Sequence, residues 1–336
     1  MDPRLISNTK SLLEDKSRRI VIVTHTNPDG DAVGSSLGMY ICLRNAGCLD
    51  VEVVVPNAYP GFLKWLPFNE KVIVASDRPQ KARELIMGAD LVFCLDFNGF
   101  SRIDALQDVL VSANGVKVLI DHHPEPEPGF DLVFSYPGSS STAELVYEFF
   151  EALGWSSCVD QEAAECLYAG IVTDTGSFSY SCNNPGTYLI TAKLIRTGVD
   201  GERIHRLIYN TYSSDRMRLL GYCLSERLVV MPEQQTAYIS LGKNDLDRFH
   251  YQEGDTEGVV NYALSIENIS LAALFTEHED HIKVSFRSAG DVDVNRFARD
   301  HFYGGGHVNA AGGKSFDPME STLLRFEELV KALTSG

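Results

Sequence analysis

Residues 23–36 read VTHTNPDGDAVGSS and contain three side chains that can bind metal ions or move protons, His25, Asp29 and Asp31. They directly follow an apolar run, where such groups lose hydration and repel one another unless something compensates. A divalent metal ion or a phosphate-rich ligand could compensate. Simple turn chemistry is the alternative, because Asn-Pro and Asp-Gly are turn dipeptides and Asp31 could cap the following helix. The segment alone leaves these alternatives open.

Three further positions carry side chains of the same kind, namely Asp96, the triplet at 121–123 (Asp121, His122, His123) and Asp174. Asp96 and the triplet each end an apolar run that predicts a strand. The carboxyl ends of parallel strands lie along one edge of a sheet, so we expect these side chains to converge with those of the first segment. The triplet alone could be a solvated strand end and Asp174 part of a plain loop, but their common edge favours a site.

The predicted cluster contains carboxylates and imidazoles without thiolates, a donor set that suits Mn²⁺, Mg²⁺ or Fe²⁺. It offers more ligands than one ion can use, which favours two ions that share a carboxylate. Two metal ions about 3.5–4 Å apart stabilise the attacking and leaving oxygens of an in-line phosphoryl displacement. The residue types therefore predict hydrolysis of a phosphate ester.

The net charge of the 336-residue chain is −17, with 46 acidic against 29 basic residues. Proteins that bind long nucleic acids usually present a basic surface, because phosphate neutralisation supplies their affinity. The charge thus argues against a long nucleic acid as partner, whereas a short anion could still enter a pocket whose field is set by bound cations.

The cysteines are seven in number, irregularly spaced and without a CxxC pair. This pattern is typical of reduced thiols in a cytoplasmic protein. The polar start MDPRLISNTK shows no signal peptide. No apolar run reaches the roughly 20 residues of a membrane helix, so no membrane partner is expected.

Apolar runs alternate with helical patterns over the first two hundred residues, which predicts an α/β domain with a mainly parallel sheet flanked by helices. Helices are expected at 32–47 and 141–154, the second with Ser141 and Glu144 spaced as a capping box, and 161–178 is expected to be a helix that runs into a loop. The expected strands are 19–24, 51–55, 72–75, 90–96, 117–121 and, more weakly, 131–135.

The second half of the chain predicts a smaller α/β domain with a mixed sheet. Its expected strands include 229–232, 236–241, 270–277 and 281–288, and helices are expected near 293–302 and 319–333. We place the first domain at 1–195, a helical linker at 196–228 and the second domain at 229–336. The active site is expected in the cleft between the domains.

The second domain contains GGGHVNAAGG at 304–313. Its glycines, Gly304, Gly305 and Gly306, let backbone N–H groups approach an anion, and His307 follows where a helix is expected to begin. Arg287 and Ser288 end a predicted strand and could add a guanidinium and a hydroxyl. Taken alone, the motif fits a glycine-rich turn before a helix equally well.

Together these motifs resemble those of the DHH phosphoesterases. The matching residues are H-x-x-P-D-G-D-A-x-G-S at 25–35, Asp96, D-H-H at 121–123 and Asp174, and the glycine-rich segment resembles that of the DHH-associated C-terminal domain. The resemblance covers nearly the whole chain. Length and domain pairing are most similar to the stand-alone nano-RNase and pAp-phosphatase members, the NrnA type.

The resemblance implies a role for each of these residues. His25 and Asp29 would bind one metal ion, Asp31, His122 and Asp174 the other, and Asp96 would bridge the two. His123 would contact the scissile phosphate or its leaving group, and Asp121 would orient a ligand imidazole. Substrate would be bound by residues of the second domain: Arg287, Ser288, Gly304, Gly305, Gly306 and His307. Asn98 and Arg102 are weaker candidates at the substrate's edge, equally well explained as a turn and a surface residue.

The implied activity is Mn²⁺-dependent hydrolysis of short oligoribonucleotides to 5′-nucleoside monophosphates, or of pAp to AMP and phosphate. Mg²⁺, Fe²⁺ and Co²⁺ are alternative metals. Hydrolysis of pApA or cyclic di-AMP is the nearest alternative function. An inorganic pyrophosphatase or exopolyphosphatase and a nucleotide sensor without turnover are further ones. Whether the chain forms a homodimer, and the direction of digestion, stay open.

Overall fold

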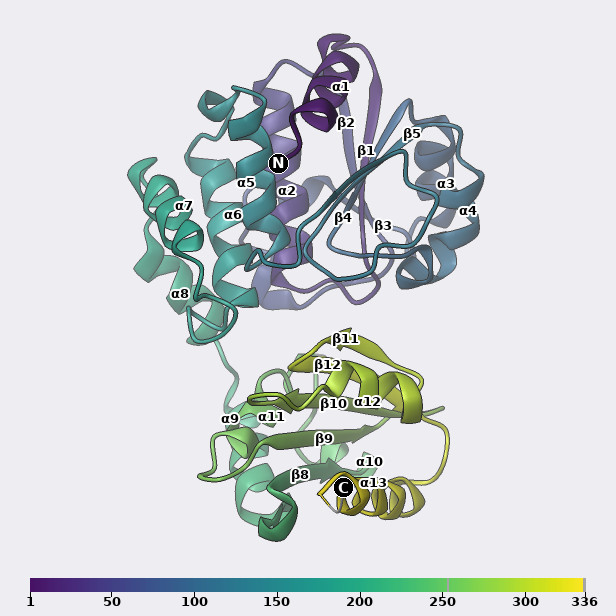
Figure 1. The fold of residues 1–336 in the computed structure, drawn as a ribbon, viewed down its shortest axis with the longest axis vertical. Helices are drawn as coiled ribbons and strands as arrows, with labels where there is room; N and C mark the ends of the chain where they lie inside the picture. Colours follow the sequence, from purple (N-terminus) through teal and green to yellow (C-terminus); the bar gives the residue numbers. More distant parts are fainter. Residues whose placement is uncertain (253, 335–336) are drawn as a thin grey trace. The chain divides into compact units, whose positions relative to one another are not determined.

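The computed structural model describes residues 1–252 and 254–334. The chain divides into two compact units, Met1–Thr211 and Tyr212–Gly336 (Figure 1). This division falls inside the segment 196–228 that the sequence predicts to be a helical linker, and the predicted boundaries at 195 and 229 stay predictions.

The first unit is built on a sheet with the strand order β3-β2-β1-β4-β5-β6, in which all neighbouring strands are parallel. Its strands are β1 (Arg19–Thr24), β2 (Asp50–Val55), β3 (Val72–Val74), β4 (Leu91–Leu95), β5 (Val116–Asp121) and β6 (Leu132–Ser135). The predicted parallel α/β fold is thereby confirmed, including the weakly predicted strand at 131–135.

Helices cover both faces of this sheet (Figure 1). They are α1 (Pro3–Glu14), α2 (Gly30–Asn45), α3 (Pro79–Gly88), α4 (Gln107–Ser112), α5 (Thr142–Ala152) and α6 (Gln161–Asp174), and α7 (Pro185–Arg196) and α8 (Gly201–Tyr209) pack on α6. Successive strand residues point to opposite faces, so Ile20 packs in the core beneath α2, α5 and α6 and Val21 in the core beneath α3 and α4. Burial on both faces explains why the strands are mostly apolar.

The strand order reverses between β1 and β4, since the chain runs outward from β1 to β3 and then returns to the other side of β1. At such a point the loops after the two adjacent strands diverge and leave room for a ligand at the carboxyl edge. His25 directly follows β1 and Asp96 directly follows β4. The topology thus places two of the predicted metal ligands at this reversal.

Helices α2 and α6 pack closely along a row of glycines on α2. A Cβ atom on Gly30 would lie within 2.6 Å of the Thr173 side chain, and one on Gly34 would lie 2.6 Å from the Cys166 carbonyl oxygen. The helices run in opposite directions, so the start of α2 lies beside the end of α6. Absence of side chains at these positions is what lets Asp31 approach Asp174.

The second unit has a mixed sheet with the order β11-β12-β10-β9-β8-β7, in which β8 and β9 are parallel and the other pairs antiparallel. This confirms the predicted mixed α/β fold. The strands are β7 (Leu228–Met231), β8 (Thr236–Leu241), β9 (Leu271–Glu277), β10 (Ile282–Ser288), β11 (Gly305–His307) and β12 (Ala310–Ser315). The helices are α9 (Ser214–Tyr222), α10 (Lys243–Arg248), α11 (Val259–Leu264), α12 (Val294–His301) and α13 (Met319–Thr334).

The glycine-rich segment forms a hairpin, and the helix predicted to begin near His307 is wrong. β11 pairs with β12 in antiparallel register, with Gly305 opposite Gly312 and His307 opposite Ala310. The physical reason is close backbone contact: a Cβ atom on Gly304 would lie 1.9 Å from the Gly312 carbonyl oxygen. The glycines thus serve to pack one strand against another.

Among the residues that the structure describes, no helix combines the length and the apolar character that crossing a membrane requires.

Candidate metal centre

His25 is held by the backbone of the loop that follows β1. Its Nδ1 lies 2.9 Å from the Thr26 carbonyl oxygen, which only accepts hydrogen bonds, so Nδ1 donates to it and Nε2 is the nitrogen that faces the carboxylates. Nε2 lies 3.4 Å from Asp96 Oδ2 and 4.0 Å from Asp29 Oδ1. This arrangement of one bonded and one available nitrogen is typical of metal-binding histidines.

Asp29 is the residue that caps α2, because its Oδ1 accepts hydrogen bonds from the backbone N–H groups of Asp31 and Ala32 at 3.0 Å each. The alternative that Asp31 caps this helix is therefore wrong. The Asp29 side chain is half exposed, whereas His25 is buried. Capping orients the Asp29 carboxylate toward the His25 imidazole.

Asp31 lies in the first turn of α2 and is buried. Its carboxylate accepts hydrogen bonds from the N–H groups of Thr142 (2.7 Å, to Oδ2) and Ala143 (2.9 Å, to Oδ1). The start of a helix favours a negative charge, since its first N–H groups lack partners and its dipole is positive there. Helix α5 thus stabilises the most deeply buried of the proposed metal-binding carboxylates.

Asp96 lies between two groups of side chains. Its Oδ2 faces Nε2 of His25 at 3.4 Å, and its Oδ1 faces Nε2 of His122 at 3.4 Å. Its backbone has φ = +65°, a left-handed conformation that is uncommon outside glycine and is found where a site requires it. The side chain thereby presents one oxygen to each group.

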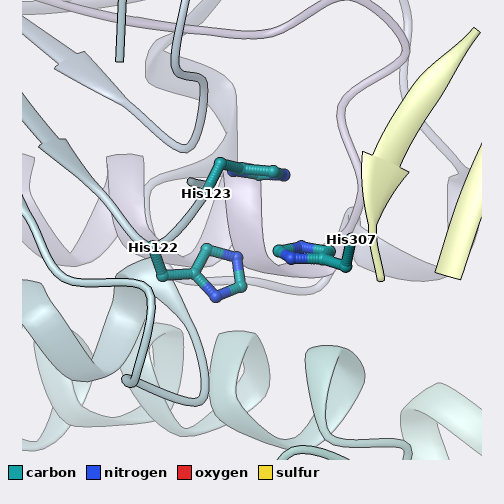
Figure 2. A group of neighbouring side chains, drawn as sticks. All are labelled: His122, His123 and His307. Carbon is teal, nitrogen blue, oxygen red and sulfur yellow. The ribbon is translucent and has the colours of Figure 1, made fainter. Parts of the chain in front are cut away.

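The triplet after β5 supplies two imidazoles with different environments. Figure 2 shows the rings of His122 and His123 beside one another, with centroids 4.9 Å apart. His122 Nε2 lies within 4 Å of carboxylate oxygens of Asp31, Asp96 and Asp174. The Nδ1–H of His123 donates to Asp121 Oδ1 at 2.7 Å. Asp121 therefore orients His123, the predicted substrate-contacting residue.

Asp174 is the last residue of α6, and its side chain is 27% exposed. It is the most accessible partner of His122, with Oδ2 3.6 Å from Nε2. Its position at a helix carboxyl end adds the negative end of the helix dipole to the negative charge of the site.

The electrostatics of the site show an excess of buried negative charge. Burial raises the pKa of Asp31 well above its usual range and the pKa of Asp174 to about 6. Burial alone would lower the pKa of His122, but Asp174 and Asp96 outweigh it and raise that pKa well above its usual range. Without metal ions, the site thus binds protons where cations would otherwise bind.

Asp96 shows the opposite shift. Its burial alone would raise its pKa, but hydrogen bonds with His122 and His25 hold the pKa well below its usual range. Asp96 therefore carries its negative charge in the middle of the site.

These residues form overlapping groups whose ligand atoms are close enough to bind a metal ion. One group contains His25, Asp29 and Asp96, and another contains Asp31, Asp96 and His122. Both share Asp96, and their donors are the oxygens and nitrogens that Mn²⁺ or Mg²⁺ prefers. In addition, Asp121 Oδ2 is buried and has no hydrogen-bond partner among the residues that the structure describes. The donor set fits divalent cations.

The predicted candidates of the second unit lie around the β11–β12 hairpin. Ser288 is buried; its hydroxyl donates to the Val292 carbonyl oxygen at 2.6 Å and accepts from Asn309 at 2.9 Å. Ser288 thus supports the turn of the hairpin. Arg287 is partly buried on β10 and donates to the Phe286 carbonyl oxygen. Gly306 N–H donates to Asn295 Oδ1 at 2.9 Å, and His307 ends β11.

The weaker candidates Asn98 and Arg102 have structural contacts near the site. Asn98 donates to the Pro124 carbonyl oxygen at 2.7 Å, and the Arg102 carbonyl oxygen accepts from Thr26 N–H at 2.8 Å. They join the loops that follow β1, β4 and β5. Their proposed contacts with substrate stay predictions.

The sequence analysis missed Thr142, whose hydroxyl donates to Asp96 Oδ1 at 3.1 Å. Its only local signal was the start of α5 at Ser141. The Ser141 side chain does accept from Glu144 N–H, but the Glu144 carboxylate accepts from Ser140 in place of closing the capping box at Ser141. Nothing in the local pattern relates this turn to Asp31 or Asp96.

Comparison with known proteins identifies the family of this chain. The sequence profile of the DHH family, N-terminal domain, matches residues 19–171, and that of the DHHA1 domain matches residues 235–335. A protein of Thermus thermophilus, the "bifunctional oligoribonuclease and PAP phosphatase NrnA", is 34% identical over 93% of this chain and 91% of its own length. The chain belongs to the DHH family.

Other relatives of this DHH protein match over the same extent. The Bacillus subtilis protein that bears the same NrnA name is 29% identical over 93% of this chain and 95% of its own. A solved structure of an "exopolyphosphatase-related protein" from Bacteroides fragilis is 41% identical, with a TM-score of 0.95 over 99% of this chain and 97% of that one. The predicted membership, with a DHH and a DHHA1 domain and NrnA relatives, is confirmed.

Proposed function

We propose that this chain is a metal-dependent phosphoesterase that hydrolyses short oligoribonucleotides to 5′-nucleoside monophosphates and pAp to AMP and phosphate. Its membership in the DHH family and the names of its NrnA relatives support this proposal. The acidic and imidazole groups of the first unit supply the chemistry that such an activity requires.

The position of Asp96 is the observation that supports the proposal most. Each of its two oxygens faces a different group of potential ligands at 3.4 Å. We assign His25 and Asp29 to one divalent cation and Asp31, His122 and Asp174 to the other, with Asp96 shared. Mn²⁺ is the proposed metal, because the mixture of hard oxygens and imidazoles suits it.

Divalent cations at this position supply positive charge for the phosphate and acidify water near neutral pH. The protein itself contributes a positioned imidazole. Because Asp121 accepts the Nδ1 proton of His123, this bond orients the ring, and Nε2 is the nitrogen that would contact a phosphate oxygen or the leaving oxygen. We propose this contact with the reacting phosphate as the role of His123.

We propose that the second unit binds the nucleotide part of the substrate through Arg287, His307 and the backbone of Gly304, Gly305 and Gly306. A guanidinium is a donor that suits a phosphate. The glycine backbone would contribute by letting the ligand approach closely, since the N–H groups of Gly304 and Gly306 already donate to Ala298 and Asn295. Ser288 then acts by holding Asn309 in the hairpin turn, because its hydroxyl already donates to the Val292 carbonyl oxygen. The net charge of −17 favours short substrates over long nucleic acids.

A reducing compartment such as the cytoplasm is the proposed location. Cys42, Cys94 and Cys166 are buried as free thiols, and burial raises the pKa of each well above its usual range, which keeps them unreactive.

Hydrolysis of inorganic polyphosphate is a second candidate function. It is supported by the description of the Bacteroides fragilis relative as exopolyphosphatase-related. The same metal centre would serve either substrate, so only an assay separates them.

The test is to quantify products from pAp, pApA, cyclic di-AMP, a 5-mer RNA, a 20-mer RNA and polyphosphate, with chelator-treated protein and added Mn²⁺. We expect pAp and the 5-mer to be degraded at least tenfold faster than the 20-mer and polyphosphate. Faster hydrolysis of polyphosphate, pApA or cyclic di-AMP would replace the proposed substrates. Equal rates on 5-mer and 20-mer would contradict the proposed preference for short chains.

Asp96→Asn tests the metal centre, and Asp108→Asn is its matched control. Loss of this shared charge should lower turnover by at least about a hundredfold and reduce bound Mn²⁺, as is typical when a ligand is removed. Asp108→Asn, on the exposed surface of α4, should retain both. Retained activity in Asp96→Asn would contradict the shared-ligand assignment.

A further inference from the structure

The first turn of α5 contacts two of the proposed metal-binding carboxylates at once. Thr142 N–H donates to Asp31 Oδ2 at 2.7 Å, and the Thr142 hydroxyl donates to Asp96 Oδ1 at 3.1 Å. Ala143 N–H donates to the other oxygen of Asp31 at 2.9 Å. Thr142 is fully buried. Thr142 therefore links Asp96, which follows β4, with Asp31, which lies in the first turn of α2.

The Thr142 hydroxyl contacts one particular oxygen of the Asp96 carboxylate. Its hydrogen bond is made to Oδ1, the oxygen that faces His122, while Oδ2 faces His25. A carboxylate rotates easily about its Cβ–Cγ bond, so that a donor on one side is needed to keep one oxygen toward each group. The hydroxyl is the atom of Thr142 that makes this contact.

The turn that carries Thr142 is itself anchored by a buried carboxylate. Glu144, 1% exposed, accepts from Ser140 N–H at 3.1 Å, from the Ser140 hydroxyl and from the Thr187 hydroxyl at 2.8 Å. Ser141 accepts from Glu144 N–H. Because Thr187 belongs to α7, these bonds connect the start of α5 to a second helix. Thr142 is thus presented on a rigid turn.

We infer that Thr142 is a positioning residue of the metal centre: its hydroxyl fixes the orientation of Asp96, and its backbone N–H fixes Asp31. Both metal positions depend on it, although Thr142 itself is no ligand. The inference deepens the proposed function and rests on it.

The experiment compares Thr142→Val, Thr142→Ser and Thr9→Val in the full chain. Valine keeps the shape and backbone N–H but removes the hydroxyl, and serine keeps the hydroxyl. Thr9 is equally buried, but its hydroxyl donates to the Leu5 carbonyl oxygen within α1. Mn²⁺ is titrated into each chelator-treated protein by calorimetry without substrate, and the Tm of each protein is measured.

We expect Thr142→Val to bind at least one Mn²⁺ about 10–100-fold more weakly than the wild type, the usual effect of losing a group that orients a ligand. Thr142→Ser should bind Mn²⁺ with an affinity within about threefold of the wild type. Thr9→Val should bind Mn²⁺ as the wild type does, since neither variant loses the hydrogen bond to Asp96. The Tm of Thr142→Val should fall no further than that of Thr9→Val. Turnover of pAp should fall in Thr142→Val and be restored in Thr142→Ser.

Wild-type Mn²⁺ binding by Thr142→Val would overturn the inference. So would an equal loss in Thr142→Ser, which would point to packing of the methyl group, or an equal loss in Thr9→Val, which would indicate a general effect on stability. A wild-type protein that binds no Mn²⁺ would overturn the proposed metal centre as well, and is recognised before any variant is compared.

Discussion

At the scale of residues, the candidate site is organised by how each imidazole uses its two nitrogens. His25 donates from Nδ1 to a backbone carbonyl, and His123 donates from Nδ1 to Asp121. In His25 this leaves Nε2 to face the carboxylates of Asp29 and Asp96. His122 Nε2 lies within 4 Å of three carboxylates, which is an arrangement that a cation would stabilise.

Asp121→Asn tests the role of the residue that orients His123. An amide is uncharged and binds the Nδ1–H more weakly, so we expect turnover of pAp to fall about 10–100-fold while bound Mn²⁺ is retained. Turnover and metal content are measured on the same preparation. Loss of Mn²⁺ in parallel with activity would contradict this assignment and make Asp121 a metal ligand.

The pKa of Asp174, raised to about 6 by burial, predicts how the metal-free protein responds to pH. The folded state binds this proton more tightly than the unfolded state, whose carboxyl group has a pKa near 4. The protonated Asp174 side chain therefore stabilises the folded state below about pH 4, and this stabilisation is lost as the pH rises through about 6. The loss amounts to at most about 3 kcal/mol.

Asp174→Asn isolates this contribution, because an amide resembles the protonated acid. In the presence of chelator, we expect the free energy of unfolding of the variant to exceed that of the wild type at pH 7.5 and to equal it near pH 4. Urea denaturation at both pH values measures the difference. A variant that is less stable than the wild type at pH 7.5 would contradict the predicted cost of the ionised side chain.

At the scale of elements, the contact between α2 and α6 brings the start of one helix to the end of the other. The contact depends on glycine, since side chains on α2 would meet the backbone of α6. A Cβ atom on Gly170 of α6 would in turn lie 2.9 Å from Asp31 Oδ1. Packing and chemistry are thus coupled in this helix pair, and a change in helix spacing displaces a proposed ligand.

Gly34→Ala tests this coupling. Its Cβ atom would lie 2.6 Å from the Cys166 carbonyl oxygen, so we expect the free energy of unfolding to fall by about 1–3 kcal/mol, typical of overpacking, and Mn²⁺ binding to weaken. Gly221→Ala is the control. It lies in α9, where a Cβ atom would meet nothing within 4 Å, and should raise stability by about 0.5–1 kcal/mol. Equal effects of Gly34→Ala and Gly221→Ala on the free energy of unfolding and on Mn²⁺ binding would contradict the proposed coupling between helix packing and the metal centre.

At the scale of the whole molecule, the first unit has the proposed metal-binding function and the second unit the proposed nucleotide-binding function. The parallel sheet of the first unit collects acidic and imidazole groups at its carboxyl edge, and the mixed sheet of the second presents a glycine-rich hairpin. Because each unit has its own core, a substitution in the hairpin should leave the metal centre intact.

His307→Ala tests this division. We expect bound Mn²⁺ to be unchanged and KM for pAp to rise about tenfold or more, since a phosphate contact is lost. Hydrolysis of a simple activated phosphodiester, which lacks the nucleotide, should be little affected. His250→Ala, an exposed histidine of the second unit, is the control. An equal loss on both substrates would show that His307 acts at the reacting phosphate or supports the fold.

Much of the fold was predictable from the sequence. The runs at 19–24 and 236–241 coincide with β1 and β8, and 117–121 lies within β5. The segment 304–313 was not predictable in the same way. Its glycines permit either a helix start or a hairpin, and the contact of Gly304 with Gly312 decides for the hairpin.

The sequence by itself determined most strands and helices of this protein and which ionisable residues follow its strands, because burial periodicity and chain order are local properties. Only the tertiary structure decided what those residues contact. That Asp31 and Asp96 both accept hydrogen bonds from Thr142 follows from the way the elements pack. Contacts between segments a hundred residues apart leave no periodic pattern in either one.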